Sequence, residues 1–105
     1  MRRYKKYQEY LIESLKDPEE ASAYLKASLD EAIETNEFKI FQLALRNVVE
    51  AQGVISEISS KMDVGRKSFY KSLSQKGKPR FSTIMQALKS CGVEMDFHPT
   101  HMANF

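Results

Sequence analysis

The sequence has little of several residue types on which common folds and active sites depend. Its 105 residues include one cysteine, four glycines, three prolines and no tryptophan. A single cysteine, Cys91, excludes an internal disulfide, so the fold must depend on a packed core. None of the few glycines belongs to a G-x-G-x-x-G, Walker or G-x-S-x-G motif. Because these motifs are absent and no histidine and acid pair is evident to activate Cys91, we expect no enzyme and no cofactor.

Metal sites and membrane segments are equally poorly supported. His98 and His101 are the only histidines, and with Cys91 they form too small a ligand set for a structural zinc site. We therefore expect no bound metal. The longest apolar runs are a few residues, well short of the ~18 needed to cross a bilayer, and the start of the chain has no uninterrupted apolar region. These features predict a cytoplasmic protein with no membrane contact.

The low net charge of +2 hides two segments of opposite sign. Residues 17–37 contain seven acidic residues and one basic residue, a net charge of −6. Residues 61–80 contain seven basic residues and one acidic residue, a net charge of +6. Such segments attract partners of opposite charge, although each could equally be a solvated helix face. The acidic segment fits an ordinary surface and a docking site for a basic protein about equally well.

Apolar spacings of three and four residues predict a chain of helices. Asp17-Pro18-Glu19-Glu20 is typical of a helix start, with Asp17 as the N-cap and Glu20 at the capping-box position. Asn36 and Gly53 fall where the second and third helices should end. The predicted helices cover residues 4–15, 18–34, 38–51, 55–62, 66–74 and 81–91.

Two of these helices, residues 55–62 and 66–74, are joined by the short turn Asp63-Val64-Gly65. This is the pattern of a helix-turn-helix module. Phe69 and Leu73 are spaced to face the core, while the other side of the second helix is basic and polar. A helix of about nine residues is roughly 13 Å long and fits the major groove of DNA. The residues placed to contact bases or phosphates are Arg66, Lys67, Tyr70 and Lys71, with Lys76, Lys78 and Arg80 from the following loop.

The stretch ALRNVVEAQGVISEISSKMDVGRKSFYKSLSQKGKPRFSTIMQALKSCGVEM resembles the addiction-module antidote proteins, small Xre/Cro-type helix-turn-helix antitoxins. The upstream SLKDPEEASAYLKASLDEAIE is similar to the same family's lead-in. The resemblance implies Arg66, Lys67, Ser68, Tyr70 and Lys71 on a recognition helix, and Ser56 at a phosphate-binding position of the preceding helix.

Three positions depart from the family pattern. Ser59 replaces the usual small residue, often alanine, between the paired helices. Asp63 replaces the glycine of the turn, and Gly65 replaces the serine or threonine that caps the recognition helix. Each is tolerable, because aspartate accepts a left-handed backbone and glycine is an acceptable N-cap.

After Gly92, the residues Val93, Met95 and Phe97 alternate with acidic residues. The alternation predicts a short strand. Such a strand could pair with a second copy of the chain or with a toxin, so these three residues are candidates for a dimer or partner interface. Packing of the same side chains on their own chain is at least as well supported.

The sequence thus predicts an all-α fold with a lambda-repressor-like helix-turn-helix core and a short C-terminal strand. The expected parts are an N-terminal helical extension (1–36), a DNA-binding domain (37–92) and a strand with a tail (93–105). The resemblance implies a type II antitoxin that binds operator DNA, represses its own operon and neutralises a RelE-type toxin. We expect a homodimer, because one recognition helix reads few base pairs. The alternatives are a module that binds mainly protein, and a phage-type or metabolic repressor without a toxin.

Overall fold

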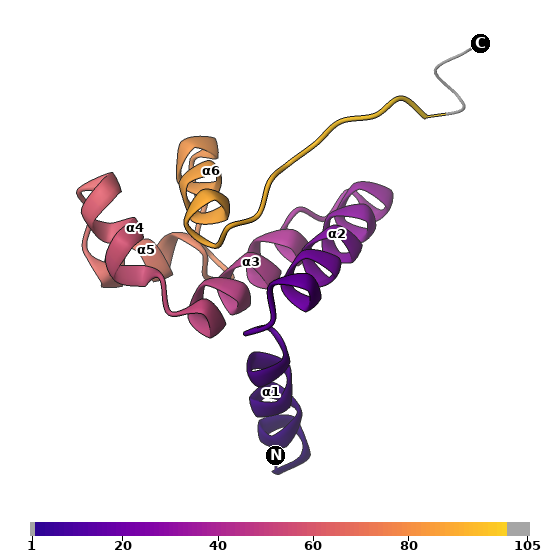
Figure 1. Cartoon of the computed structure of the whole chain (residues 1–105), viewed down its shortest axis with the longest axis horizontal. Coiled ribbons are helices and arrows are strands. Elements are labelled where there is room, and N and C mark those ends of the chain that lie inside the picture. Colours follow the sequence, from indigo (N-terminus) through magenta and orange to yellow (C-terminus); the bar gives the residue numbers. More distant parts are fainter. Residues whose placement is uncertain (1, 101–105) are drawn as a thin grey trace.

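The computed structural model describes residues 2–100, and helices are the only regular secondary structure in this part of the chain (Figure 1). The helices are α1 (Arg2–Ser14), α2 (Pro18–Thr35), α3 (Lys39–Gln52), α4 (Ile55–Met62), α5 (Arg66–Ser72) and α6 (Phe81–Ser90). Each corresponds to a predicted helix. Helix α5 is two residues shorter than expected, because the chain leaves the helix at Leu73 (φ −95°, ψ 5°).

The predicted strand over Val93–Phe97 is wrong. No strand occurs among residues 2–100, and the chain beyond Gly92 is an irregular, extended segment that leaves α6 and runs past α2 (Figure 1). An alternating pattern yields a strand only when a neighbouring strand supplies the ladder of hydrogen bonds, and the helical chain offers none. The fold class is therefore all-helical, without the expected strand.

Local sequence explains where α2 begins and ends. The Asp17 carboxylate accepts a hydrogen bond from the Glu19 amide at 3.0 Å, and Pro18 occupies the first helical position. The Asp17 amide donates to the Ser14 carbonyl at 3.2 Å. In the expected capping box the Asp17 amide would donate to the Glu20 side chain. It bonds to the Ser14 carbonyl instead. Asn36 ends the helix in the left-handed region, with φ 58°.

Helix α3 is the central element and contacts α1, α2 and α6 (Figure 1). Its apolar spacing places Phe41, Leu45 and Val48 inward, with Leu45 and Val48 fully buried. One continuous core contains residues of α2 and of the helices from α3 to α6, so α2 shares the core of the later helices. The buried apolar residues of this core are Leu15, Ala21, Leu25, Ala32, Phe41, Ala44, Leu45, Val48, Val49, Ala51, Ile58, Phe69, Leu73, Ile84, Ala87, Leu88 and Cys91.

Amide side chains on α3 fix the first two helices. The Asn47 amide oxygen accepts from the Gln8 amide at 3.2 Å, and the Asn47 amide nitrogen donates to the Tyr24 hydroxyl at 3.0 Å. Five residues after Asn47, Gln52 donates to the Leu15 carbonyl at 2.8 Å, where α1 ends. These bonds satisfy polar groups at the helix junctions, which would otherwise weaken the packing.

We predict that Asp17→Ala lowers the free energy of unfolding by about 1 kcal/mol, because it removes the side-chain acceptor at the start of α2. Urea unfolding followed by circular dichroism measures the change. Asp17→Asn is the matched control, since it removes the same charge but keeps an acceptor. An equal loss in both variants would contradict the hydrogen-bond explanation and indicate an effect of charge.

Candidate nucleic-acid interface

The turn between α4 and α5 has the tight geometry that the sequence predicted. Asp63 lies in the left-handed region with φ 54°, and the Val64 amide donates to the Ser59 carbonyl at 3.1 Å. Gly65 is extended (φ −75°, ψ 156°) and makes no side-chain cap for α5. The Ser59 hydroxyl is buried and has no hydrogen-bond partner within residues 2–100. All three departures from the family pattern are therefore accommodated, with the Ser59 hydroxyl left unsatisfied.

Helix α5 separates its apolar and basic residues onto two faces. Phe69 is 2% exposed and Leu73 is fully buried, and both belong to the core. The polar residues expected on the outer face are exposed to solvent; they are Arg66, Lys67, Ser68 and Lys71. The helix is therefore attached by one side and presents three cations on the other.

A hydrogen bond links two of the predicted DNA-contacting residues. The Arg66 guanidinium donates to the Ser56 hydroxyl, which connects the start of α5 to the start of α4. Both side chains are exposed. The bond limits the motion of a long side chain and so reduces the entropy that Arg66 would lose on binding an anion.

Tyr70 is half-buried beside this pair. Its ring packs edge-on against Phe69 at 5.7 Å between centroids, and the Arg46 guanidinium lies 5.6 Å from the Tyr70 ring centroid. Burial raises the pKa of the Tyr70 hydroxyl, as does the nearby Glu50 carboxylate, while Arg46 and Arg66 oppose the shift. The hydroxyl therefore stays protonated near neutral pH and can donate a hydrogen bond to a phosphate or base.

The loop after α5 is held by one buried side chain of α3. Gln42 is 2% exposed, and its amide nitrogen lies 2.7 Å from the Ser74 carbonyl, 3.2 Å from the Gly77 carbonyl and 3.4 Å from the Ser72 carbonyl. Lys39 also donates to the Gly77 carbonyl. These contacts supply donors to the carbonyl of the last α5 residue and to two carbonyls of the loop. The loop is therefore fixed against α3.

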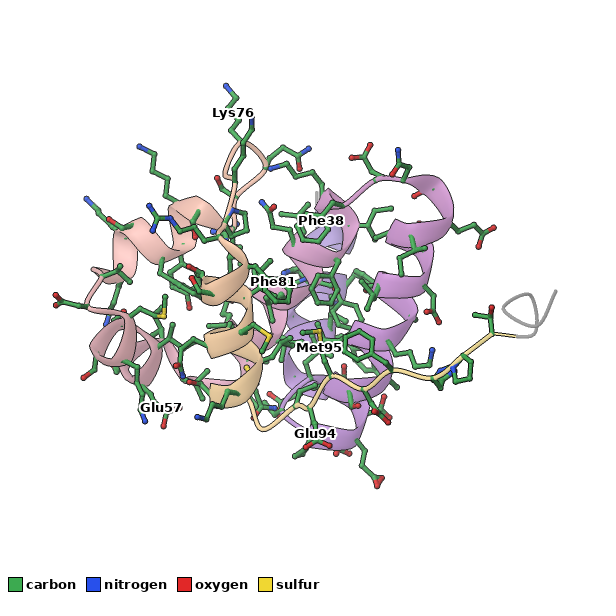
Figure 2. The ribbon with its side chains drawn as sticks, turned by 90° about the horizontal axis from the view of Figure 1, so that it is seen from above. Phe38, Glu57, Lys76, Phe81, Glu94 and Met95 are labelled. Carbon is green, nitrogen blue, oxygen red and sulfur yellow. The ribbon has the colours of Figure 1, made fainter. Side chains whose placement is uncertain are left out.

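The loop cations extend the basic surface of α5. Lys76, Lys78 and Arg80 are exposed, and Lys76 lies at the tip of the loop and points away from the body (Figure 2). Arg80 directly precedes α6 at its N-cap position. We define the basic face as the set of exposed cations on α5 and this loop: Arg66, Lys67, Lys71, Lys76, Lys78 and Arg80.

Two residues that shape the basic face were not identified from the sequence. Gln42 and Arg46 lie four residues apart in the most apolar helix, with Gln42 buried and Arg46 half-buried. The Nε atom of Arg46 is buried and has no hydrogen-bond partner in the described part of the chain. A polar residue within an apolar helical stripe indicates a side chain that binds another part of the fold, because buried polar groups normally have hydrogen-bond partners. The sequence could not identify those partners, which lie at least 24 positions away.

The C-terminal candidates for a partner interface differ in exposure. Val93 and Met95 are half-buried against the core, whereas Phe97 is 89% exposed. Packing on the same chain therefore accounts for part of the burial of Val93 and Met95. The role of the three residues in an interface stays a prediction.

The remaining candidate groups are Cys91 and the two histidines. Cys91 is buried, and burial raises the pKa of its thiol to about 11, with a smaller contribution from Glu57. His98 is exposed, and His101 lies outside the described residues. Among residues 2–100 no three histidine, cysteine or acidic side chains cluster as metal ligands. No helix in the same range is long and apolar enough to cross a membrane.

The fold and its basic face define a small all-helical protein with a paired-helix cationic surface, and the comparisons with known proteins give its family. Residues 5–99 match the model of the family described as "Probable addiction module antidote protein". The chain belongs to this family. Membership indicates an addiction-module antitoxin and implies a toxin partner of some kind.

A relative from Haemophilus influenzae, described as "Uncharacterized protein", is 26% identical over 93 residues. The match covers 89% of this chain and 91% of the relative. No solved structure shows a significant match to the chain. The similarity to the relative therefore spans nearly all of both proteins.

We predict that Gly77→Ala lowers the free energy of unfolding by about 1–3 kcal/mol, because a Cβ at this position would collide with the backbone carbonyls of Ser72 and Lys71. Gly65→Ser is the matched control. Its Cβ meets no atom within 4 Å, and its hydroxyl can cap α5, so stability should rise by a few tenths of a kcal/mol. Urea unfolding measures both; equal stability of the Gly77→Ala and parent proteins would contradict the close approach.

We predict that stability falls between about pH 9 and pH 11 partly through Cys91. The pKa of this thiol is raised on folding, so its stabilising contribution is complete below pH 9 and is lost as the pH approaches 11. The loss should reach about 2 kcal/mol by pH 11. Measuring unfolding in parallel for Cys91→Ala cancels the titration of other groups. Parallel pH profiles for the two proteins would refute this prediction.

Proposed function

We propose that the protein is a type II antitoxin that binds its own operator DNA through the basic face and represses its operon. The observation that carries the DNA proposal is the arrangement of α4 and α5. Two short helices joined by a tight turn present Arg66, Lys67 and Lys71 outward, while Phe69 and Leu73 anchor the second helix. This separation is what insertion into a major groove requires.

Each group of residues has a distinct proposed role. Arg66, Lys67, Ser68 and Tyr70 lie where the start and middle of α5 would meet base edges and nearby phosphates. Ser56, near the start of α4, and Lys71 would contact the backbone. Lys76, Lys78 and Arg80 would hold phosphates beside the groove. Gln42 and Arg46 would act indirectly, by holding the loop and Tyr70 in place.

We propose that the DNA-bound form is a homodimer. Helix α5 has seven residues, enough to read only a few base pairs. Two copies on related half-sites would multiply specificity. The expected result in sedimentation velocity with an operator fragment is two chains per site.

The proposed toxin is a small, basic protein of the RelE type. The acids of residues 17–37, with a net charge of −6, support this assignment because they would attract a cationic partner. Direct binding would neutralise the toxin by covering its active surface. We also propose that the protein acts in the cytoplasm, where operator and toxin are both present.

Binding to a fragment of its own promoter tests the DNA proposal. We predict that affinity falls steeply with salt, because each neutralised phosphate releases counterions. Arg66→Ala with Lys71→Ala should weaken binding about tenfold or more and remove sequence preference. Fluorescence anisotropy at several salt concentrations measures the salt dependence of the affinity and the loss of affinity in the variant.

Lys16→Ala with Lys26→Ala is the matched control for this test. Both lysines are exposed and form only surface ion pairs, with Glu13 and Asp30, so the same charge is removed away from the basic face. Equal weakening of DNA binding in both double variants would show that the lost net charge, and not the position of the cations, lowers the affinity. DNA binding that does not depend on salt would refute the DNA proposal. So would the absence of DNA binding in both the free and the toxin-bound protein.

Co-expression separates the alternatives. A toxic neighbouring gene whose effect is suppressed even by the Arg66→Ala, Lys71→Ala variant would show that neutralisation does not need the basic face. Loss of promoter binding in that variant, with repression of a reporter also lost, supports autorepression. A repressor with no toxic neighbour would instead fit a phage-type or metabolic regulator.

A further inference from the structure

A second surface lies on the side of α2 that faces the C-terminal segment. It is a groove of about 390 Å³, with one wall from α2 and the other from residues 93–98. Its apolar lining includes Leu29, Ile33 and Phe97. Ile33 is 70% exposed and Phe97 is 89% exposed. Exposed large apolar side chains that flank a groove are typical of interaction sites.

The groove is also acidic. Asp30, Glu94 and Asp96 line it together with one lysine, Lys26. Lys26 forms an ion pair with Asp30 at 3.0 Å. Within residues 6–100 neither Glu94 nor Asp96 forms an ion pair, although the Asp96 carboxylate accepts a hydrogen bond from the Phe97 amide at 2.8 Å. A partner that covers this groove gains most if it carries positive charge next to apolar side chains.

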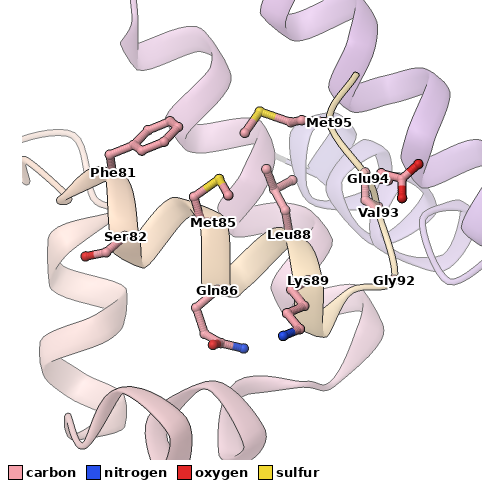
Figure 3. A pocket seen from close by; sticks show the side chains of 10 residues that line it. All are labelled: Phe81, Ser82, Met85, Gln86, Leu88, Lys89, Gly92, Val93, Glu94 and Met95. Carbon is pink, nitrogen blue, oxygen red and sulfur yellow. The ribbon is translucent and has the colours of Figure 1, made fainter. Parts of the chain in front are cut away.

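A second exposed apolar patch, on α6, lacks this charge. It is lined by Phe81 and Met85, which are 66% and 46% exposed, and it reaches Met95 (Figure 3). The charged residues at its edge are Lys89 and Glu94, one of each sign. Charge complementarity therefore favours a basic partner at the groove on α2 and not at the α6 patch.

We propose that the groove between α2 and residues 93–98 is the docking site for a basic, apolar-faced segment of the toxin. The inference rests on the proposed antitoxin function and adds the surface through which this protein would bind the toxin. Ile33 and Phe97 would supply the buried contacts. Asp30, Glu94 and Asp96 would pair with lysine or arginine at the rim. The basic face on α5 and its loop would remain available to DNA in the complex.

The test uses the purified full chain and the toxin encoded beside its gene. We expect Ile33→Lys and Phe97→Ala each to weaken toxin binding about tenfold or more, as loss of a central apolar contact does at other interfaces. Asp96→Asn should reduce the salt dependence of the toxin association rate. Isothermal titration and stopped-flow mixing measure these changes. Phe81→Ala is the control and should leave toxin affinity unchanged.

Circular dichroism and urea unfolding of each variant check that the fold is intact. If the unmodified chain forms no complex with the toxin, the proposed antitoxin function fails and this inference fails with it. If it forms a complex that Ile33→Lys and Phe97→Ala leave unaffected, or that Phe81→Ala weakens, only the site is wrong. Loss of self-association in Ile33→Lys with unchanged toxin affinity would assign the groove to a second copy of the chain and overturn the proposal.

Discussion

The arrangement of the whole molecule depends on the side chains of α3. Its apolar face supplies the buried centre of the core, and three amide side chains at its margins bind distant backbone and side-chain groups. Gln42 holds the loop after α5, Asn47 joins α1 to α2, and Gln52 binds the end of α1. Because a buried amide without a partner costs about 1–3 kcal/mol, these bonds constrain where the other helices can lie.

The constraint at Gln42 connects packing to the proposed DNA interface. Its amide bonds to carbonyls on either side of Lys76, so the position of the loop cations depends on a residue that is itself hidden from solvent. The Arg46 guanidinium of α3 similarly lies over the ring of Tyr70. The basic face is therefore supported by α3, while its charge comes from α5 and the loop. Such support reduces the conformational entropy that binding would otherwise cost.

The two charged regions are carried by different elements of one core. The acids of residues 17–37 lie mainly on α2, and the cations of residues 61–80 lie mainly on α5 and its loop. Helix α2 packs against α3, and Gln42 of α3 binds the loop after α5, so α3 fixes the two regions relative to each other. A net charge near zero is thus compatible with two surfaces of opposite sign and with two partners of different chemistry.

The sequence by itself determined the six helices, the Asp17 cap, the ends of α2 and α3 at Asn36 and Gly53, and the inward positions of Phe69 and Leu73. These features follow from local spacing and local hydrogen bonds. It also indicated the antidote family, to which the chain belongs. Only the tertiary structure decided that Val93–Phe97 forms no strand, since a ladder needs a neighbouring strand. It alone revealed Gln42 and Arg46 as supports of the basic face, because their partners lie far along the chain. The groove beside Ile33 likewise needs two segments about sixty residues apart, which no local pattern brings together.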